Sequence, residues 1–320
     1  MRRTFIPLAG ALLLTGCELQ EVAIADAEPF VVVESYLSAG LPALVALHAS
    51  VGADELLEAD AIVELVAEDT TLTLERVDID RCLSVAYDYD PNDFPGGLAC
   101  YAQARPDTIV PDSWLTEAGV RYRLDVTLPD GSTLSGATRV PQPVAFALDD
   151  DEAPDGCFLP PWTQAELVWN AAEGAAAYIL DLRVFGLRDA LAAEGIDADI
   201  DDPFSLRGVS IGQADTSLVL PAQIGVFDRF DIDADAALAL QRGLPPGTRF
   251  TVVLVAVDRN YVDWVRGGDF NPSGPLRTPS LYGDAGTGVF GSMTLDVLEG
   301  DTDASRLPDD APTCEMGSTS

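Results

Sequence analysis

The chain contains no lysine and only one histidine, His48. Without lysine, Schiff-base chemistry and the phosphate-binding loops that use a lysine are excluded. A hydrolase with a Ser-His-acid triad would have to use His48 as its base. Gly208–Gly212 has the letters of a G-x-S-x-G nucleophile elbow around Ser210, but that motif requires its histidine later in the chain. We therefore assign no catalytic residue and expect a protein that is not an enzyme, with a hydrolase as the remote alternative.

Basic side chains are scarce. Lys and Arg together number 18 against 53 Asp and Glu, which gives a formal net charge of -35. Such a charge disfavours nucleic acid and anionic lipid head groups as partners, because both would be repelled. The acidic residues are spread along the chain instead of forming a tail. We interpret this acidity as solvation of an extracellular surface, with cation binding as the alternative.

Long apolar runs are also lacking after residue 16, where none approaches the roughly 18 to 20 residues that span a bilayer. The start of the chain is different, since Arg2 and Arg3 precede an apolar run that ends in Leu14-Thr15-Gly16-Cys17. This order is the one that bacterial lipoprotein processing recognises, and the pattern is typical of an export signal. We expect residues 1–16 to be removed and Cys17 to carry the lipid, which would be the only membrane attachment.

The cell envelope is therefore the expected location. Glu18 follows Cys17 directly, and an aspartate at that position is what is associated with retention in the inner membrane in some bacteria. Its absence favours the outer membrane, with the protein either periplasmic or exposed on the surface.

Four cysteines remain once Cys17 is assigned to the lipid, and an even number in an exported chain indicates disulfides. Three pairings are open. We favour Cys82 with Cys100, which are close in sequence, and Cys157 with Cys314, which would return the chain end to the start of its second half. A zinc site is the alternative, but C-x₂₋₄-C spacing is absent.

β-rich segments separated by turn residues run through the chain. Tyr122–Leu128 alternates apolar and polar residues, and Pro129-Asp130-Gly131 turns it into Ser132–Val140, which predicts a hairpin. Phe250–Val257 is almost continuously apolar and predicts a buried central strand. Long strands with little helix predict a mainly β protein of two tandem β-sandwich domains, with closure into a barrel as the alternative for either.

Two short helices are expected in the second half, because Leu187–Glu194 and Asp235–Arg242 are each followed by glycine. The Pro141-Gln142-Pro143 segment marks the domain boundary, since two prolines stiffen a connection. The expected organisation is a signal peptide over 1–16, an acidic tether over 17–28, an N-terminal β-sandwich over 29–141, a C-terminal β-sandwich with inserted helices over 142–302 and a polar tail over 303–320.

Aromatic residues near the chain end form one candidate binding site. They lie in a loop-rich stretch with polar neighbours such as Asn260 and Asp263, a mixture of flat faces and polar groups that binds sugars or peptides. The alternative is that they cover the end of a sandwich. The candidate residues are Tyr261, Trp264, Phe270 and Tyr282.

Alternating acids form a second candidate site. Asp231, Asp233 and Asp235 have the spacing that calcium loops use. An EF-hand loop starting at Asp231 should have Gly at its sixth position and Glu at its twelfth, whereas Ala236 and Arg242 stand there. A calcium site of another kind stays open beside the simpler interpretation of solvated loop acids. We expect no other cofactor.

Two resemblances reach specific residues. The segment Leu244–Val257 resembles the penultimate strand of a fibronectin type III domain, in which a Pro-Gly-Thr turn precedes a strand with a corner tyrosine. Trp169 and Tyr178 stand where the early core aromatics of that fold would be. Phe250 replaces the tyrosine, so the corner hydrogen bond is absent. The resemblance implies a fibronectin-like second domain.

The order of features also resembles an uncharacterised family of bacterial surface lipoproteins, a domain of unknown function often encoded beside TonB-dependent outer-membrane receptors. This resemblance implies outer-membrane anchoring and a role in nutrient capture. The function we expect is a non-catalytic envelope lipoprotein that binds a ligand or a partner such as that receptor, with a structural or adhesive protein as the alternative. The resemblance rests on the signal, Val31–Glu34, Tyr122–Val140, Ala256–Asp258 with Tyr261, and Gly288–Gly291.

Overall fold

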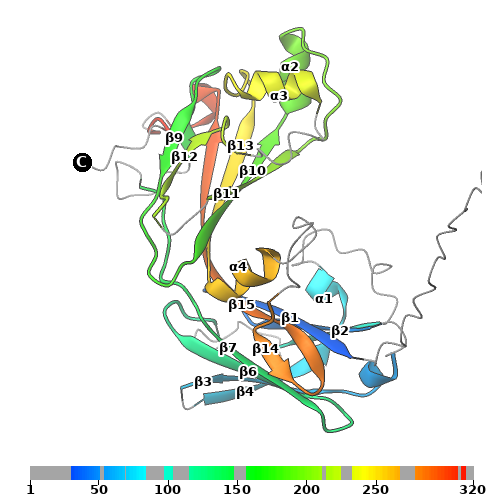
Figure 1. The fold of residues 1–320 in the computed structure, drawn as a ribbon. Coiled ribbons are helices and arrows are strands. Elements are labelled where there is room, and N and C mark those ends of the chain that lie inside the picture. The colour runs from blue at the N-terminus through cyan, green and yellow to red at the C-terminus, as the bar shows by residue number, and fades with distance from the viewer. Residues whose placement is uncertain are drawn as a thin grey trace, which may run out of the picture.

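The computed structural model describes residues 30–50, 54–68, 70–83, 97–103, 115–147, 156–210, 214–224, 233–266, 278–308 and 311–314. In Figure 1 these residues form two parts, with helix α4 beside the joint between them. The first part contains β1 (Val31–Ser38), β2 (Leu44–Ala49), η1 (Asp54–Leu57), β3 (Ile62–Ala67), β4 (Thr70–Val77), α1 (Asp80–Leu83), β5 (Leu98–Ala102), β6 (Arg121–Thr127), β7 (Thr133–Arg139) and β14 (Leu281–Gly283).

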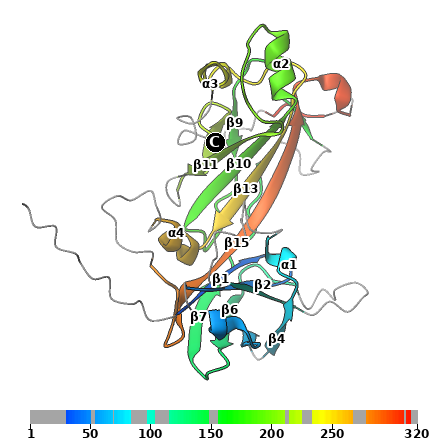
Figure 2. The ribbon, with the colours of Figure 1, turned by 90° about the vertical axis from the view of Figure 1, so that its right-hand side faces the viewer.

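The second part contains most of the remaining elements. They are β8 (Cys157–Phe158), β9 (Ala165–Val168), β10 (Ala177–Phe185), α2 (Leu187–Ala193), β11 (Phe204–Ser210), β12 (Ser217–Leu220), α3 (Ala234–Leu240), β13 (Arg249–Val257) and η5 (Ala304–Arg306). Helix α4 (Arg259–Arg266) follows β13, and β15 (Gly286–Asp301) runs through both parts (Figure 2).

The first part is a closed barrel of nine strands in the order β1-β2-β5-β4-β3-β6-β7-β14-β15, completed by parallel pairing of β15 with β1. Along β1 every second side chain points inward, so that Val31, Val33 and Leu37 are buried. These side chains share one apolar core with Leu124 and Phe290. The barrel interior is therefore a packed core built by period-two alternation.

Strand β15 explains how the two parts are joined. From Gly286 to Met293 it pairs with β1, and from Met293 to Asp301 it pairs with β13. Strand β13 also pairs with β10, and β10 pairs with β11, so one sheet extends from the barrel into the second part. The two parts thus share a continuous strand as well as the connection after β7.

The prediction of two tandem β-sandwich domains is wrong. The barrel closes through pairing of β1 with β15, two segments about 250 residues apart in sequence. The local residue pattern of a strand carries no information on which distant strand it pairs with. A boundary at residues 141–143 also leaves out the barrel's β14 and the first half of β15.

The core of the second part lies between the extended sheet and the two-stranded pair β9–β12. Leu167 and Leu220 from that pair share an apolar cluster with Leu180 and Leu254 from the extended sheet. The expected strand over 250–257 is β13, and the two expected helices are α2 and α3. The hairpin over 122–140 is formed by β6 and β7, as its alternation and turn predicted.

Both predicted disulfides are confirmed. Cys82 of α1 is bonded to Cys100 of β5, and Cys157 of β8 is bonded to Cys314. The second bond returns the chain end to the beginning of the second part. Among the residues that the structure describes, no helix is long and apolar enough to cross a membrane.

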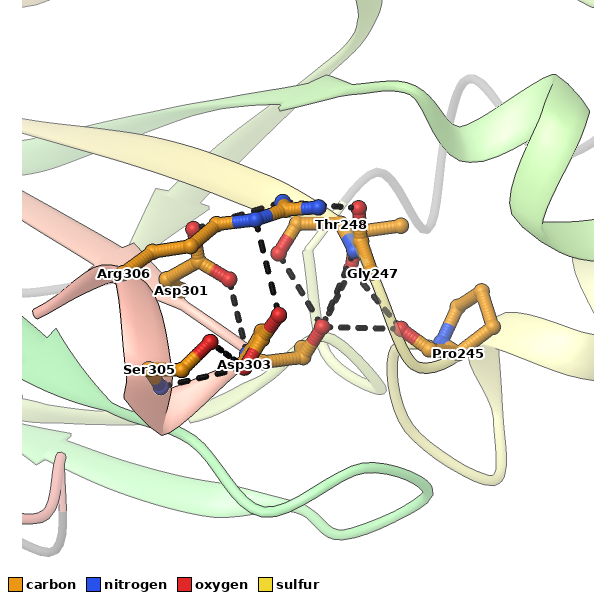
Figure 3. Close-up of polar contacts among 8 residues, drawn as sticks. Pro245, Gly247, Thr248, Asp301, Asp303, Ser305 and Arg306 are labelled. Carbon is orange, nitrogen blue, oxygen red and sulfur yellow. Dashed lines mark hydrogen bonds and ion pairs between the residues drawn. The ribbon is translucent and has the colours of Figure 1, made fainter.

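A polar clamp holds the chain after β15, and Figure 3 shows it. The backbone N–H of Thr248 donates to the hydroxyl of Thr302 at 2.9 Å, which joins the turn before β13 to the end of β15. Arg306 donates to the carbonyl of Gly247 at 3.2 Å and lies 3.6 Å from a carboxylate oxygen of Asp303. The Ser305 hydroxyl and N–H both donate to Asp303 and lower the pKa of that carboxyl. These contacts fix the segment after β15 against the turn before β13.

Candidate ligand-binding cleft beside helix α4

The position of α4 is set by a buried carboxylate, Asp258, which directly follows β13. Its Oδ1 accepts from the backbone N–H of Tyr261 at 2.9 Å, as a helix cap does. Its Oδ2 accepts from the hydroxyl of Thr138 on β7 at 2.6 Å. Burial raises the pKa of Asp258, while these hydrogen bonds oppose the rise. Asp258 therefore ties the start of α4 to the barrel.

Asn260 makes the second link between α4 and the barrel. Its Nδ2 donates to the carbonyl of Ala137 at 2.9 Å and to the carbonyl of Phe290 at 2.8 Å. These carbonyls belong to β7 and β15, which are not neighbours in the barrel order, because β14 lies between them. The first turn of α4 is thus fixed on both strands by side-chain hydrogen bonds.

A cleft of about 330 Å³ opens between this helix and the barrel wall. Gly136 forms part of its floor, and a Cβ at this position would lie 2.2 Å from the carbonyl oxygen of Ser280. The close approach of β7 and the segment before β14 therefore requires glycine. The lining residues are Gly136, Ala137, Asn260, Asp263, Thr278, Pro279, Ser280 and Tyr282.

Tyr282 and Asp263 provide the chemistry of the cleft. Tyr282 is 64% exposed, and its hydroxyl donates to the carbonyl of Pro279 at 2.6 Å, which orients the ring. The Asp263 side chain is 39% exposed and lies 3.9 Å from the guanidinium of Arg259, one helical turn earlier. An oriented aromatic face beside a partly exposed carboxylate is suited to reversible binding.

The four aromatic residues named from the sequence have different positions in the structure. Tyr282 lines the cleft. Tyr261 instead packs edge-on against Tyr36 with 5.4 Å between ring centroids, and burial raises the pKa of its hydroxyl. Trp264 is only 6% exposed. Phe270 lies outside the described residues. Two of the four thus stabilise the packing of α4, which is the alternative that the sequence left open.

The floor of the cleft was missed by sequence reasoning. Gly136 and Ala137 are in the second strand of the predicted hairpin, but nothing nearby indicated which segment approaches it. A glycine inside a strand is the one local signal of close backbone approach that was present. Asn260 and Asp263 were named only as polar neighbours of the aromatic residues, and both line the cleft.

The alternating acids have a local structural role where they are described. Asp233 is the N-cap of α3, and its carboxylate accepts from the backbone N–H groups of Asp235 and Ala236. Asp231 lies outside the described residues. Within the described part of the chain, no group of three or more Asp, Glu, His or Cys residues is arranged to hold a metal ion. The calcium hypothesis stays a prediction.

His48 and Ser210 are not neighbours in the sheet. His48 is on β2, is 5% exposed, and its Nε2 lies 3.6 Å from a carboxylate oxygen of Glu34 on β1. Ser210 ends β11. Even by the shorter path through the pairing of β1 with β15, the strands β1, β15, β13 and β10 lie between β2 and β11. Within the described residues, the element after β11 is strand β12 and not the helix that a nucleophile elbow requires. The arrangement gives no support to a Ser-His pair.

Cys17 and the whole segment before residue 30 lie outside the described residues, so lipidation stays a prediction. No protein-family model matches the chain, and no curated protein is significantly similar to it. Trp169 and Tyr178 pack edge-on with 5.5 Å between ring centroids, and the resemblance to a fibronectin type III domain stays a prediction.

Proposed function

We propose that this chain is a non-catalytic lipoprotein of the cell envelope that binds a ligand in the cleft beside α4. The observation that carries the proposal is the Tyr282 ring, which is exposed at the edge of a cleft whose other polar groups include Asp263 and Asn260. Concave sites that combine an aromatic surface with a few convergent polar groups are the usual form of small-molecule sites.

The charge of the chain restricts the ligand. A formal net charge of -35, together with Asp263 in the cleft itself, repels anions. We therefore propose an uncharged ligand, and a neutral oligosaccharide fits best. The face of Tyr282 would stack on the apolar C–H face of a sugar ring, and Asp263 and Thr278 would accept or donate hydrogen bonds to its hydroxyls. A basic peptide is the alternative occupant.

The location is part of the same proposal. Two disulfides are consistent with an oxidising compartment, and the sequence from Met1 to Cys17 has the pattern of a lipoprotein signal. We propose that Cys17 carries a lipid in the outer membrane. A TonB-dependent receptor as partner is supported only by the resemblance in feature order.

Ligand-observed NMR with maltose, cellobiose, lactose and a short arginine-containing peptide tests the proposal. We expect at least one neutral sugar to bind and Tyr282→Ala to weaken it about tenfold or more, which is the loss of roughly 1.4 kcal/mol of contact. Leu238→Ala is the matched control, because Leu238 is an exposed apolar residue on α3. Binding of the peptide alone would favour the other occupant. If nothing binds, the structural or adhesive alternative is favoured.

A further inference from the structure

A second cavity, of about 210 Å³, opens at one end of the barrel. It lies where β3 ends and β4 and β6 begin, beside the end of β5. Its apolar walls include Leu65, Leu72, Leu115 and Val120. None of its lining residues also lines the α4 cleft, so the two are separate sites.

Gln103, which directly follows β5, lines this cavity and is only 2% exposed. Among the residues that the structure describes, neither its Oε1 nor its Nε2 has a hydrogen-bond partner. Leaving buried polar atoms unpaired is costly, and native proteins rarely do so without a reason. The last side-chain torsion of a glutamine has a broad minimum, so the amide can turn toward the cavity at little cost. An unpaired donor and acceptor on one side chain can make two hydrogen bonds to a molecule bound in the cavity.

Another part of the cavity wall, around Thr116 and Glu117, is fixed by hydrogen bonds. The backbone N–H of Gly40 donates to the carbonyl of Thr116 at 2.8 Å, and the N–H of Thr116 donates to the carbonyl of Leu41 at 3.1 Å. The N–H of Glu117 donates to the hydroxyl of Tyr122 at 2.9 Å. These bonds hold the segment from Thr116 to Glu117 against the barrel, so the cavity is preformed.

We propose that this cavity binds a small uncharged molecule with a compact apolar body and an amide-like head group. A carboxamide or lactam presents a donor next to an acceptor, which matches the Oε1 and Nε2 of Gln103 with two hydrogen bonds. The apolar body contacts Leu65, Leu72 and Val120. Glu68 and Glu117 also line the cavity, so a carboxylate in place of the amide is repelled.

Benzamide is the probe, and benzoate is its charged counterpart of nearly equal shape. Protein-observed NMR titration of the full chain should give a dissociation constant on the order of 1 mM for benzamide, as expected for a fragment of this size. Benzoate should bind at least about tenfold more weakly. Gln103→Leu should weaken benzamide at least about tenfold and leave the melting temperature unchanged or higher, because it removes two unpaired buried polar atoms. Gln241→Leu, at the exposed C-cap of α3, is the matched control.

Several outcomes would overturn the proposal. Benzamide that does not bind the wild-type chain at millimolar concentration, or that binds Gln103→Leu equally well, excludes the site. A melting temperature that falls in Gln103→Leu without any benzamide binding indicates that ordered water alone is the partner. If Gln103→Leu does not fold, Ala67→Leu provides the test. This substitution fills part of the cavity without changing Gln103, so it must also weaken the binding of benzamide. Tyr282→Ala should leave benzamide binding intact, which separates this result from that of the α4 cleft.

Discussion

The hydroxyl of Thr138 donates a 2.6 Å hydrogen bond to the buried carboxylate of Asp258. Thr138 also lies 2.6 Å from the hydroxyl of Ser292, and Ser292 donates to the carbonyl of Arg139 at 3.0 Å. These contacts join β7, β15 and the start of α4 at the place where the barrel meets the second part. The candidate cleft beside α4 depends on this junction, because Asp258 determines where the helix begins.

Replacing Thr138 by Val should lower the free energy of unfolding, and more at neutral pH than at acidic pH. A hydrogen bond to a charged carboxylate contributes about 1.5–3 kcal/mol, whereas one to a protonated carboxyl contributes about 0.5–1.5 kcal/mol. The bond with Thr138 lowers the pKa of Asp258, so the variant raises that pKa further. Urea unfolding at several pH values between about 4 and 7 measures the difference.

The sign of the pH dependence follows from the raised pKa of Asp258. The folded state keeps this proton to a higher pH than the unfolded chain, so Asp258 stabilises the fold less as pH rises from its unfolded pKa through its folded pKa. Asp258→Asn should remove this contribution. Thr251→Val is the control, since Thr251 is a partly buried strand residue. Equal losses for Thr138→Val at both ends of the pH range would contradict the account of the junction.

Closure of the barrel depends on Gly286. Its φ is +149°, and a Cβ there would lie 2.0 Å from the carbonyl oxygen of Val31. Gly286→Ala should therefore destabilise the fold by about 2–4 kcal/mol, because backbone atoms of β1 would have to move. Thermal and urea unfolding measure the change.

Gly40→Ala is the matched control for this prediction. Gly40 also has a positive φ, +78°, but nothing lies within 4 Å of the added Cβ. It should cost only the backbone strain, about 1–2 kcal/mol. If the two alanine variants lose the same stability, the close contact between β1 and β15 is not what closes the barrel.

The two disulfides should differ in their contribution to stability. Their sequence separations are 157 for Cys157–Cys314 and 18 for Cys82–Cys100. The chain-entropy model gives about 5 kcal/mol for the longer loop and about 3 kcal/mol for the shorter one. Paired alanine replacements at each bond, compared by denaturant unfolding under oxidising conditions, measure this order. A larger loss at Cys82–Cys100 would show that strain or unfolded-state structure outweighs loop length.

Local features of this fold could be predicted from the sequence because they depend on neighbouring residues. The alternation from Tyr122 to Leu128 and its Pro-Asp-Gly turn specify a hairpin whatever the rest of the chain does. The pairing of Val31 with Gly286 has no local sign. This pairing requires a glycine where the two backbones approach, but in the sequence Gly286 does not differ from the many other glycines.

The candidate site was predicted in part for the same reason. The sequence indicated the polar and aromatic region from Asn260 to Tyr282, but burial decides what each aromatic does. Tyr261 and Trp264 are on the faces of α4 that pack inward. Tyr282 is on β14, where Leu281 is buried and the Tyr282 ring is exposed to solvent. The helical turn places Asp263 and Asn260 at the cleft, and no strand-period pattern gives that placement.

The most direct test of the proposed binding cleft is the ring signal of Tyr282 during titration with neutral oligosaccharides. In a chain with isotope-labelled tyrosines, assigned by the Tyr282→Phe variant, we predict that a binding sugar shifts the Tyr282 ring resonances in a saturable way. The buried rings of Tyr101 and Tyr178 should stay unchanged. A sugar that binds without moving the Tyr282 signals, or that shifts the buried rings equally, would contradict the assignment of the cleft beside α4 as the binding site.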